Sequence, residues 1–340
     1  AREGLRKALA ELRSAQGLRA AVLMCEGSTF FSGADIGEFS GPPKEEEYRE
    51  LFNGYEALDI PVVAAMHGTV MGGGLEIALA CHYRIALPNT RFAFPEVTLG
   101  IIPGAGGTQR LPRLIGVERA LEMILNARPV DAKQAIELGF LDATIEGDVR
   151  NGAVAYARKL IAEGRGPRRT SEMRVDPATA TSEIIEKMTA LAKKLYPNRQ
   201  AGLVAVDVVS ASVRLPIAEG LDYETKRVNE CKKLPESLGA VHVFFAERET
   251  RKVPGLPPDT ESKPINSAGI VGAGTMGGGI AICFANAGIP VTLLDANQEA
   301  LDRGLKKIDE TYESMVARGR LSAEDKAKRM SLIRPSLDYA

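Results

Sequence analysis

The stretch VMGGGLEIALACH, Val70–His82, places three consecutive glycines before an apolar helical pattern that carries one carboxylate, Glu76. Glycine in a helix interior costs about 1 kcal/mol relative to alanine. At a helix N-terminus, however, unpaired amides and the positive end of the dipole face outward, and glycine lets a ligand atom approach them. The stretch therefore predicts an oxyanion hole with Glu76 beside it. A structural alternative stays open, because the dipole alone favours a first-turn glutamate and glycines also permit close packing.

The segments on either side of this stretch predict an α/β unit with a largely buried sheet. Short apolar runs favour strands, and longer patterns with a 3.6-residue period favour helices. The expected strands are AAVLMC (20–25), VVAAM (62–66), YRIAL (83–87) and RFAFP (91–95). The expected helices are a first one carrying Leu5, Leu9 and Leu12, then Gly116–Ala127, and Asp131–Gly139 with Asp131 as N-cap and Gly139 as terminator.

Two further stretches add polar groups to the same region. STFFSGADIGEF, Ser28–Phe39, has a Ser-Gly-Ala-Asp turn after the first strand and offers a second backbone amide, that of Ala34. Glu96 follows the strand at 91–95 and a proline, which forces Phe94 into an extended conformation. We therefore expect Glu96 to be held at the exit of that strand, the alternative being a solvated loop carboxylate.

Together these stretches resemble the crotonase (enoyl-CoA hydratase) superfamily over roughly Leu18–Gly147. The shared motifs are F-x-x-G-A-D-I, H-G-x-x-x-G-G-G-x-E, F-x-x-P-E and G-x-x-P-G-x-G-G-T-Q-R-L. The resemblance implies the crotonase-like (ClpP/crotonase) spiral of sheet and helices. It also implies a site with catalytic Glu76 and Glu96, backbone oxyanion donors at Ala34 and Gly73, and substrate-binding residues Asp35, Ile36 and Gly104.

The reaction implied is hydration of a trans-2-enoyl-CoA to an L-3-hydroxyacyl-CoA, with no cofactor. Because dedicated isomerases of this superfamily usually keep one of the two acids, the presence of both Glu76 and Glu96 favours a hydratase. The alternatives are another crotonase-type reaction, such as double-bond isomerisation or thioester hydrolysis, and an inactive module that binds acyl-CoA or NAD. An accessory isomerase activity is compatible with the hydratase.

A second glycine-rich stretch, GIVGAGTMGGGIA, Gly269–Ala281, follows an apolar strand and opens an apolar helix. Its G-x-G-x-x-G glycines are Gly272, Gly274 and Gly277, and a later strand ends at Asp295. This context predicts a Rossmann-type dinucleotide site, with the pyrophosphate on the glycine turn. The Asp295 carboxylate would accept hydrogen bonds from the ribose and repel a 2′-phosphate, so we expect NAD. A glycine-rich turn without a ligand is the alternative.

This segment resembles the opening of 3-hydroxyacyl-CoA dehydrogenases. The whole chain then resembles a multifunctional β-oxidation enzyme, a family found in peroxisomes and bacteria, whose dehydrogenase half oxidises the hydratase product with NAD. We expect a hydratase domain over 1–180 that lacks the family's opening strand, a helical linker over 181–262 with a proline-rich end at 253–264, and a truncated NAD domain over 263–340. Both ends look cut, so we expect a partial NAD site and no hydride transfer. For its assembly, the resemblance implies a monomer or an association with a thiolase.

The composition excludes other classes of function. The net charge is −1, with 26% charged and 45% apolar residues. The overall electrostatic field therefore does not favour the binding of nucleic acid. No apolar run is long enough to span a membrane and no signal peptide opens the chain. The four cysteines lack metal-ligand spacing, and Cys81 and Cys283 are expected to be buried free thiols, which suits a reducing compartment. Bacterial cytoplasm is the first expectation and the peroxisomal matrix the alternative.

Overall fold

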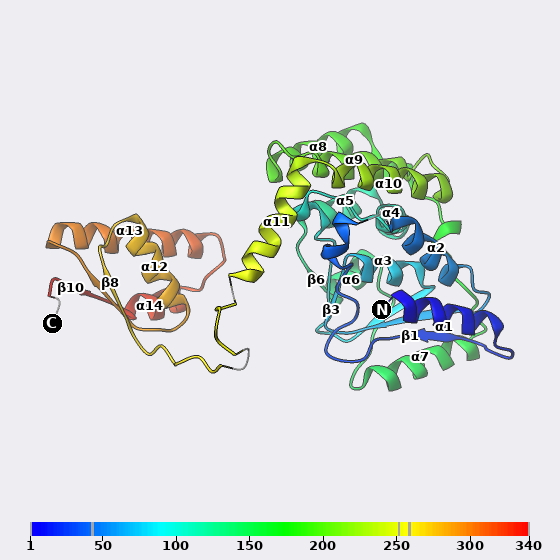
Figure 1. The fold of residues 1–340 in the computed structure, drawn as a ribbon, viewed down its shortest axis with the longest axis horizontal. Helices are drawn as coiled ribbons and strands as arrows, with labels where there is room; N and C mark the ends of the chain where they lie inside the picture. The colour runs from blue at the N-terminus through cyan, green and yellow to red at the C-terminus, as the bar shows by residue number, and fades with distance from the viewer. Residues whose placement is uncertain (1, 42–43, 251, 258–259, 339–340) are drawn as a thin grey trace. The chain divides into compact units, whose positions relative to one another are not determined.

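The computed structural model describes residues 2–41, 44–250, 252–257 and 260–338, except for the side chains of residues 39 and 40. It divides into two compact units, Ala1–Lys252 and Val253–Ala340 (Figure 1). Each unit has a hydrophobic core of its own. The finer division at residues 180 and 262 stays a prediction.

The first unit alternates strands and helices. Its strands are β1 (Ala21–Leu23), β2 (Val62–Met66), β3 (Thr69–Met71), β4 (Tyr83–Ala86), β5 (Arg91–Ala93), β6 (Val130–Asp131) and β7 (Ala143–Thr144). Its α-helices up to residue 162 are α1 (Arg2–Ser14), α2 (Glu45–Glu56), α3 (Gly73–Ala80), α4 (Gly107–Ile115), α5 (Val117–Asn126), α6 (Ala132–Leu138) and α7 (Val149–Ala162). The 3₁₀ helices are η1 (Ile36–Ser40), η2 (Glu96–Leu99), η3 (Thr170–Glu172) and η4 (Pro177–Ala180).

The main sheet of this unit has the order β1-β2-β4-β7, and every neighbouring pair is parallel. A parallel sheet is normally covered on both faces, and all five residues of β2 are buried. Helix α7 covers one face, where Ala153, Ala157 and Leu160 contact Val63 and Ala65 of β2. The alternate β2 residues Val62, Ala64 and Met66 join the larger core on the other face, with α2 and α3. The predicted α/β unit is therefore confirmed.

A second sheet, β3-β5-β6, positions the chemically interesting loops. Strands β3 and β5 run parallel with Met71 opposite Ala93, so their carboxyl ends lie at the same edge. The Gly72 amide extends the pairing by donating to the Ala93 carbonyl at 3.1 Å. The residues after β3, which begin α3, therefore lie next to the residues after β5, which lead into Glu96.

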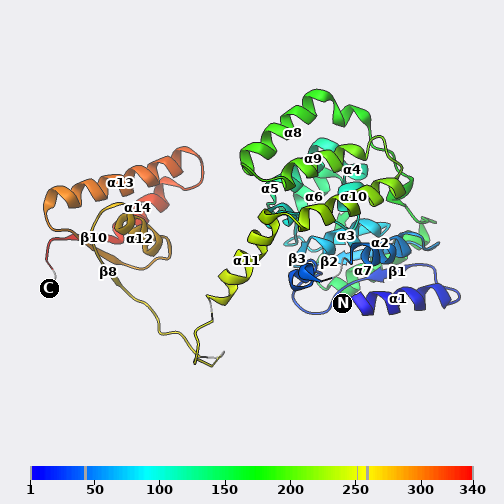
Figure 2. The same ribbon diagram turned by 45° about the horizontal axis from the view of Figure 1, so that its top comes forward.

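Four helices complete the first unit: α8 (Ser182–Leu195), α9 (Ala201–Ala211), α10 (Ile217–Lys232) and α11 (Pro235–Glu249). Helices α8, α9 and α10 form a layer over α4 and α5 (Figures 1 and 2). The segment 216–234, which the sequence predicted to be an amphipathic helix, forms α10 and buries Leu221 and Val228. Helical structure over 181–249 is thus as expected, and residue 251 of the predicted helical region lies outside the described residues.

The second unit is a three-stranded parallel sheet with helices. Strands β8 (Ala268–Val271), β9 (Val291–Leu294) and β10 (Ile333–Ser336) are arranged in the order β10-β9-β8. Helix α12 (Thr275–Asn286) joins β8 to β9, and α13 (Gln298–Ala317) and α14 (Ala323–Ser331) lie between β9 and β10 in the chain. This 3-2-1 strand order is one half of a doubly wound nucleotide-binding sheet, so the predicted start of a Rossmann-type domain is confirmed.

One sequence prediction about the cysteines is wrong. Cys81 is buried as expected, but Cys283 is exposed. Helix α12 is apolar around its whole circumference, which concealed its orientation in the sequence, and it turns Ala281 and Ala285 toward the core. Cys283 lies two residues from each of these alanines and so points to the opposite side of the helix.

Two expected absences concern the parts of the chain that the structure describes. No helix there is long and apolar enough to cross a membrane. No group of three or more histidine, cysteine, aspartate or glutamate side chains in the same ranges could hold a metal ion. The predicted linker over 253–264 contains residues 258 and 259, which lie outside the described residues; the remainder of it forms neither helix nor strand.

Candidate functional site

A cavity of about 600 Å³ opens in the first unit between loops and helices. The loops are those that follow β1, β3 and β5, and the helices are α1, α2, α3 and α10. All seven site residues predicted for this unit line the cavity: Ala34, Asp35, Ile36, Gly73, Glu76, Glu96 and Gly104. The structure thus brings three separate stretches of sequence to one cavity, which the family resemblance had implied and the residues alone had not.

The three glycines at the start of α3 differ in how much room their surroundings leave for a side chain. Gly72 has a φ of 52°, which side-chain-bearing residues rarely adopt, and a Cβ added there would lie 2.7 Å from Glu96 Oε1. A Cβ on Gly73 would lie 3.8 Å from the Ala34 amide nitrogen and 3.9 Å from Glu76 Oε2. A Cβ on Gly74 would overlap the Phe31 carbonyl oxygen. The sequence left open the alternative that these glycines only permit close packing. That alternative explains Gly74 but not Gly73.

Glu76 lies in the first turn of α3 and is 3% exposed. Its Oε1 accepts hydrogen bonds from the amides of Ala105 at 2.7 Å and Gly107 at 2.8 Å. Burial raises the pKa of Glu76, and those two hydrogen bonds partly offset the shift. One oxygen is thus held by the backbone while the other, Oε2, lies near Gly73.

Glu96 begins η2, directly after β5 and Pro95, as the sequence predicted. Its Oε2 is buried and has no hydrogen-bond partner among the described residues. Burial and then the neighbouring Glu76 carboxylate raise the pKa of Glu96 well above its usual value. A buried polar atom without a partner, facing a cavity, suits a group that handles a proton on a ligand.

Two residues whose backbone amides were predicted to be donors line the same cavity as these carboxylates. Ala34 and Gly73 lie on neighbouring loops, since a Cβ added to Gly73 would lie 3.8 Å from the Ala34 amide nitrogen. Within the described ranges, neither amide donates a hydrogen bond to the protein. Two unpaired donors beside a cavity are what an oxyanion hole requires, so this role of Ala34 and Gly73 stays a prediction.

The remaining predicted residues of this cavity have additional structural roles. The Asp35 carboxylate caps η1 by accepting a hydrogen bond from the Gly37 amide at 2.9 Å. Ile36 begins η1 next to it. A Cβ on Gly104 would lie 3.1 Å from Val228 Cγ1 and 3.4 Å from Glu45 Cγ, so only glycine fits easily between α2 and α10.

The glycine turn of the second unit has the shape expected of a dinucleotide site. Gly272 has a φ of 100°, and a Cβ on Gly277 would overlap the Gly272 carbonyl oxygen, so the helix and the turn are in close contact. A Cβ on Gly274 would meet nothing within 4 Å, which leaves the backbone at the N-terminus of α12 open to a phosphate. The Asp295 carboxylate, just after β9, accepts from the Ala273 amide at 2.7 Å, and this bond and one from Ala296 lower its pKa. These residues fit an NAD pyrophosphate and ribose.

Comparison with known families agrees with this geometry. Residues 1–202 match the Enoyl-CoA hydratase/isomerase family. The chain belongs to the enoyl-CoA hydratase/isomerase family. Residues 267–340 match the NAD binding domain of 3-hydroxyacyl-CoA dehydrogenase, so NAD is the cofactor indicated for this segment.

Curated relatives combine the same two parts. The chain is 36% identical over 353 residues to "Peroxisomal fatty acid beta-oxidation multifunctional protein AIM1" of Arabidopsis thaliana, which covers 99% of this chain and 48% of that protein. It is 36% identical over 344 residues to "Glyoxysomal fatty acid beta-oxidation multifunctional protein MFP-a" of Brassica napus, covering 97% of this chain and 47% of that protein. The chain therefore spans about half the length of the curated relatives it matches.

Solved structures agree on the fold of the hydratase/isomerase unit. A crystal structure of an enoyl-CoA hydratase/isomerase from Mycobacterium paratuberculosis matches with a TM-score of 0.52 and 22% identity, covering 71% of this chain and 86% of that one. At this identity the likeness concerns the fold alone, and it confirms the crotonase-type architecture expected from the motifs.

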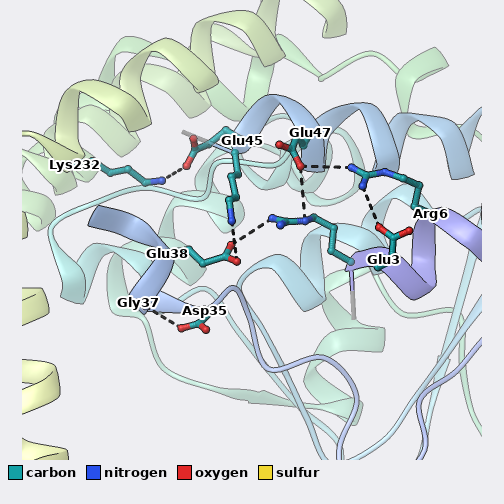
Figure 3. A network of polar contacts seen from close by, with 10 residues as sticks. Glu3, Arg6, Asp35, Gly37, Glu38, Glu45, Glu47 and Lys232 are labelled. Atoms are coloured by element: carbon teal, nitrogen blue, oxygen red, sulfur yellow. Dashed lines mark hydrogen bonds and ion pairs between the residues drawn. The ribbon is translucent and has the colours of Figure 1, made fainter. Parts of the chain in front are cut away.

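The hydratase/isomerase motifs did not reveal the contribution of helices α2 and α10. Glu45, Val228 and Lys232 line the cavity, and Lys232 forms an ion pair with Glu45. Figure 3 shows this pair beside a charged network that joins α1, η1 and the start of α2 at the cavity. The ion pairs of the network are Lys44–Glu38, Arg2–Glu38, Arg2–Glu47, Arg6–Glu47 and Arg6–Glu3.

Glu224 of α10 is the further residue that sequence reasoning missed. It is fully buried and accepts hydrogen bonds from the Gly106 amide at 2.6 Å and the Thr108 amide at 3.0 Å. A signal was present in the sequence, because Glu224 lies three residues after Leu221 and four before Val228, on the apolar face of the helix. A carboxylate in such a position must find hydrogen-bond donors or stay neutral.

Proposed function

We propose that the first unit hydrates trans-2-enoyl-CoA thioesters to L-3-hydroxyacyl-CoA, with residues 1–180 as the hydratase domain. The observation that carries this proposal is the convergence of two carboxyl groups and two unpaired amides on one cavity. A hydratase needs such a set, because it must polarise a thioester carbonyl, deprotonate a water and deliver a proton to carbon.

The amides of Ala34 and Gly73 would bind the thioester oxygen. Attack of oxygen at C3 places enolate-like negative charge on that atom, and preformed donors stabilise it without reorganising. Each such donor contributes roughly 3–4 kcal/mol to the transition state. The Gly73 amide lies in the first turn of α3, whose dipole adds to the effect.

The two glutamates would divide the proton transfers. Glu96 protonates C2, and Glu76 orients and activates the attacking water. The raised pKa of Glu96 supports this division, because two carboxyls in a dry cavity disfavour double ionisation and keep one proton between them. The Glu76 carboxylate, fixed by Ala105 and Gly107, is the better oriented of the two for holding a water.

The substrate's CoA moiety would run along the loop of Asp35 and Ile36, with Gly104 beside the reacting carbons. A double-bond isomerase activity at the same site is the second candidate, because one glutamate can move a proton between C2 and C4. The presence of both buried carboxyls favours hydration as the principal reaction.

For the intact protein we propose NAD-dependent oxidation of the hydroxyacyl product to 3-oxoacyl-CoA, with residues 181–262 linking the two activities to an NAD domain that starts at 263. NAD would accept the hydride. The α12 N-terminus after Gly272, Gly274 and Gly277 would hold the pyrophosphate, and Asp295 the ribose. The match of residues 267–340 to a dehydrogenase NAD domain supports this assignment.

We propose a reducing compartment as the place of action. Bacterial cytoplasm and peroxisomal matrix both satisfy this, and the names of the two relatives, peroxisomal and glyoxysomal, support the second. The proposed assembly is a monomer or an association with a thiolase, the class of enzyme that consumes a 3-oxoacyl-CoA.

Loss of the enoyl absorbance of crotonyl-CoA on adding the protein tests the hydratase proposal. We expect turnover by this chain without added cofactor. Binding of crotonyl-CoA without loss of that absorbance would instead identify an acyl-CoA-binding module. Chromatography of the product against the 3-enoyl isomer separates hydration from isomerisation.

A further inference from the structure

The loop from Gly104 to Thr108 is held by two carboxylates through alternate amides. Ala105 and Gly107 donate to Glu76, on the cavity side. Gly106 and Thr108 donate to Glu224, and the Thr108 hydroxyl donates to it as well. Because consecutive amides of this loop point to opposite sides, any movement that loosens one set of hydrogen bonds also misdirects the other.

Close packing of α10 on α4 brings Glu224 to this loop. A Cβ on Gly220 would overlap Gln109 Oε1, so the Gln109 side chain of α4 packs directly against the backbone of α10 there. Glu224 lies one helical turn after Gly220 and therefore on the same face of α10. A helix 118 residues further along the chain thus supplies a hydrogen-bond acceptor to the loop that fixes a proposed catalytic group.

A purely structural explanation must be considered beside the functional one. Gly106 is the N-cap of α4, and any carboxylate near a helix N-terminus stabilises the helix. That explanation accounts for the bonds to Gly106 and Thr108. It predicts a change in stability when Glu224 is altered, and no change in how the site handles protons.

We propose that Glu224 is a positioning residue of the hydratase site, which holds the amides of Gly106 and Thr108 so that those of Ala105 and Gly107 stay directed at Glu76. The inference rests on the proposed hydratase function and extends it to the helical segment after residue 180. Glu224 acts through the loop and is not itself in contact with the cavity's contents.

The charges around Glu224 give this role a pH signature. Burial and then the Glu76 carboxylate raise the pKa of Glu224 to about 8. Its charge in turn raises the pKa of Glu96, while Glu45 of α2 and Arg110 of α4 act on Glu76 in opposite directions. Ionised Glu224 therefore helps Glu96 to keep its proton in alkaline solution, so removing this charge should move the alkaline limb of kcat/KM to lower pH.

The test compares Glu224→Gln with Glu219→Gln, a substitution at an exposed glutamate in the first turn of the same helix. A glutamine at 224 offers one acceptor oxygen where the carboxylate offered two, and its amide group would face a backbone donor. We expect kcat for crotonyl-CoA to fall about 10- to 100-fold, KM to change less than about threefold, and the alkaline limb to move to lower pH. The Glu219→Gln control should match the parent.

Hydrogen–deuterium exchange of the peptide spanning residues 104–110 supplies a readout independent of activity. Glu224→Gln should accelerate exchange there and Glu219→Gln should not. If Glu224→Gln does not fold, Thr108→Val, which removes one hydroxyl donor and keeps both amides, should produce the same changes more weakly, and Thr108→Ser should restore parental behaviour.

A folded Glu224→Gln variant with parental kcat, pH profile and exchange would overturn the inference, as would a loss of thermal stability with no change in these three. If the parent chain does not hydrate crotonyl-CoA, the proposed function fails. In that case exchange at residues 105–107 still decides the loop-holding role by itself.

Discussion

Two glycine-rich turns in this molecule have the same local form and different surroundings. In both, a parallel strand ends, glycines follow and a helix starts, at Gly72–Gly74 in the first unit and at Gly272–Gly277 in the second. At Gly72–Gly74, added Cβ atoms would meet Glu96, Ala34 and Phe31, all from other loops. At Gly272–Gly277, the closest contact of an added Cβ is within the turn itself, and Gly272 and Gly274 face open space.

The difference shows what each site requires of the fold. The dinucleotide turn is local, because a strand, a turn, a helix and one aspartate after the next strand are enough to form it. The hydratase site is assembled from loops after β1, β3 and β5, with support from α2 and α10. Substitutions in the hydratase site should therefore act on residues distant in sequence, whereas substitutions in the dinucleotide turn should act through the turn alone.

Glu96→Gln should give the largest effect, a loss of at least about 100-fold in hydratase kcat, because an amide cannot exchange the proton. The same variant should be at least as thermally stable as the parent. The pKa of Glu96 is raised in the fold, so the parent loses stability as pH rises above the usual glutamate value, and glutamine removes that loss.

Crotonyl-CoA hydration and a thermal melt at pH 5 and pH 8 check both parts of this prediction. Glu50→Gln, at an exposed position on α2, is the control and should change neither. Parental turnover by Glu96→Gln would contradict the acid–base assignment.

Gly73→Pro should reduce turnover by about 100- to 1000-fold, because proline removes the proposed oxyanion donor. Proline is tolerated in the first turn of a helix, where Gly73 lies, so the fold should persist. Gly73→Ala keeps the N–H, and its Cβ would meet no neighbour closer than 3.8 Å, so it separates loss of the donor from crowding. Equal kcat values for the two variants, both folded, would exclude the Gly73 amide as a donor.

Gly277→Ala should destabilise the second unit by about 1–3 kcal/mol, because the new methyl overlaps the Gly272 carbonyl oxygen. It should weaken NADH binding and leave crotonyl-CoA hydration unchanged, which is the local behaviour described above. Gly279→Ala is the matched control, since its Cβ meets nothing within 4 Å and a helical alanine is favoured. Chemical denaturation followed by NADH titration measures both; a hydratase defect in Gly277→Ala would contradict the independence of the two sites.

Asp295→Asn should give the smallest effect on stability, and we expect that effect only at acid pH. Hydrogen bonds from the Ala273 and Ala296 amides lower the pKa of Asp295, so its contribution to stability is present above the usual aspartate pKa of about 3.9 and is lost as pH falls through the lower folded value. The variant should therefore show a flatter dependence of unfolding on pH below about 4. Melts between pH 2 and 7 check this, and identical slopes for variant and parent would contradict it.

Much of the fold could be predicted from the sequence because its signals are local. The buried strand at 62–66, the capped helix ended by Gly139, and the strand–glycine–helix turn at 269–281 are all recovered in the structure. The orientation of Cys283 could not be predicted, because α12 is apolar on every side and its burial is decided by what packs against it. Glu224 was missed for a related reason: its position on the apolar face was visible, and its hydrogen-bond partners were not.

The sequence by itself determined which chemical groups this protein carries and which local turns present them: two glutamates, glycines that free backbone amides, and a dinucleotide fingerprint with its aspartate. Only the tertiary structure decided that Glu76 and Glu96 share one cavity, because that depends on β3 and β5 pairing in parallel so that the loops after them meet. It also decided that a glutamate from α10 holds the loop that holds Glu76. Hydrogen bonds within a turn follow from neighbouring residues, whereas hydrogen bonds between distant segments exist only once the core has packed them together.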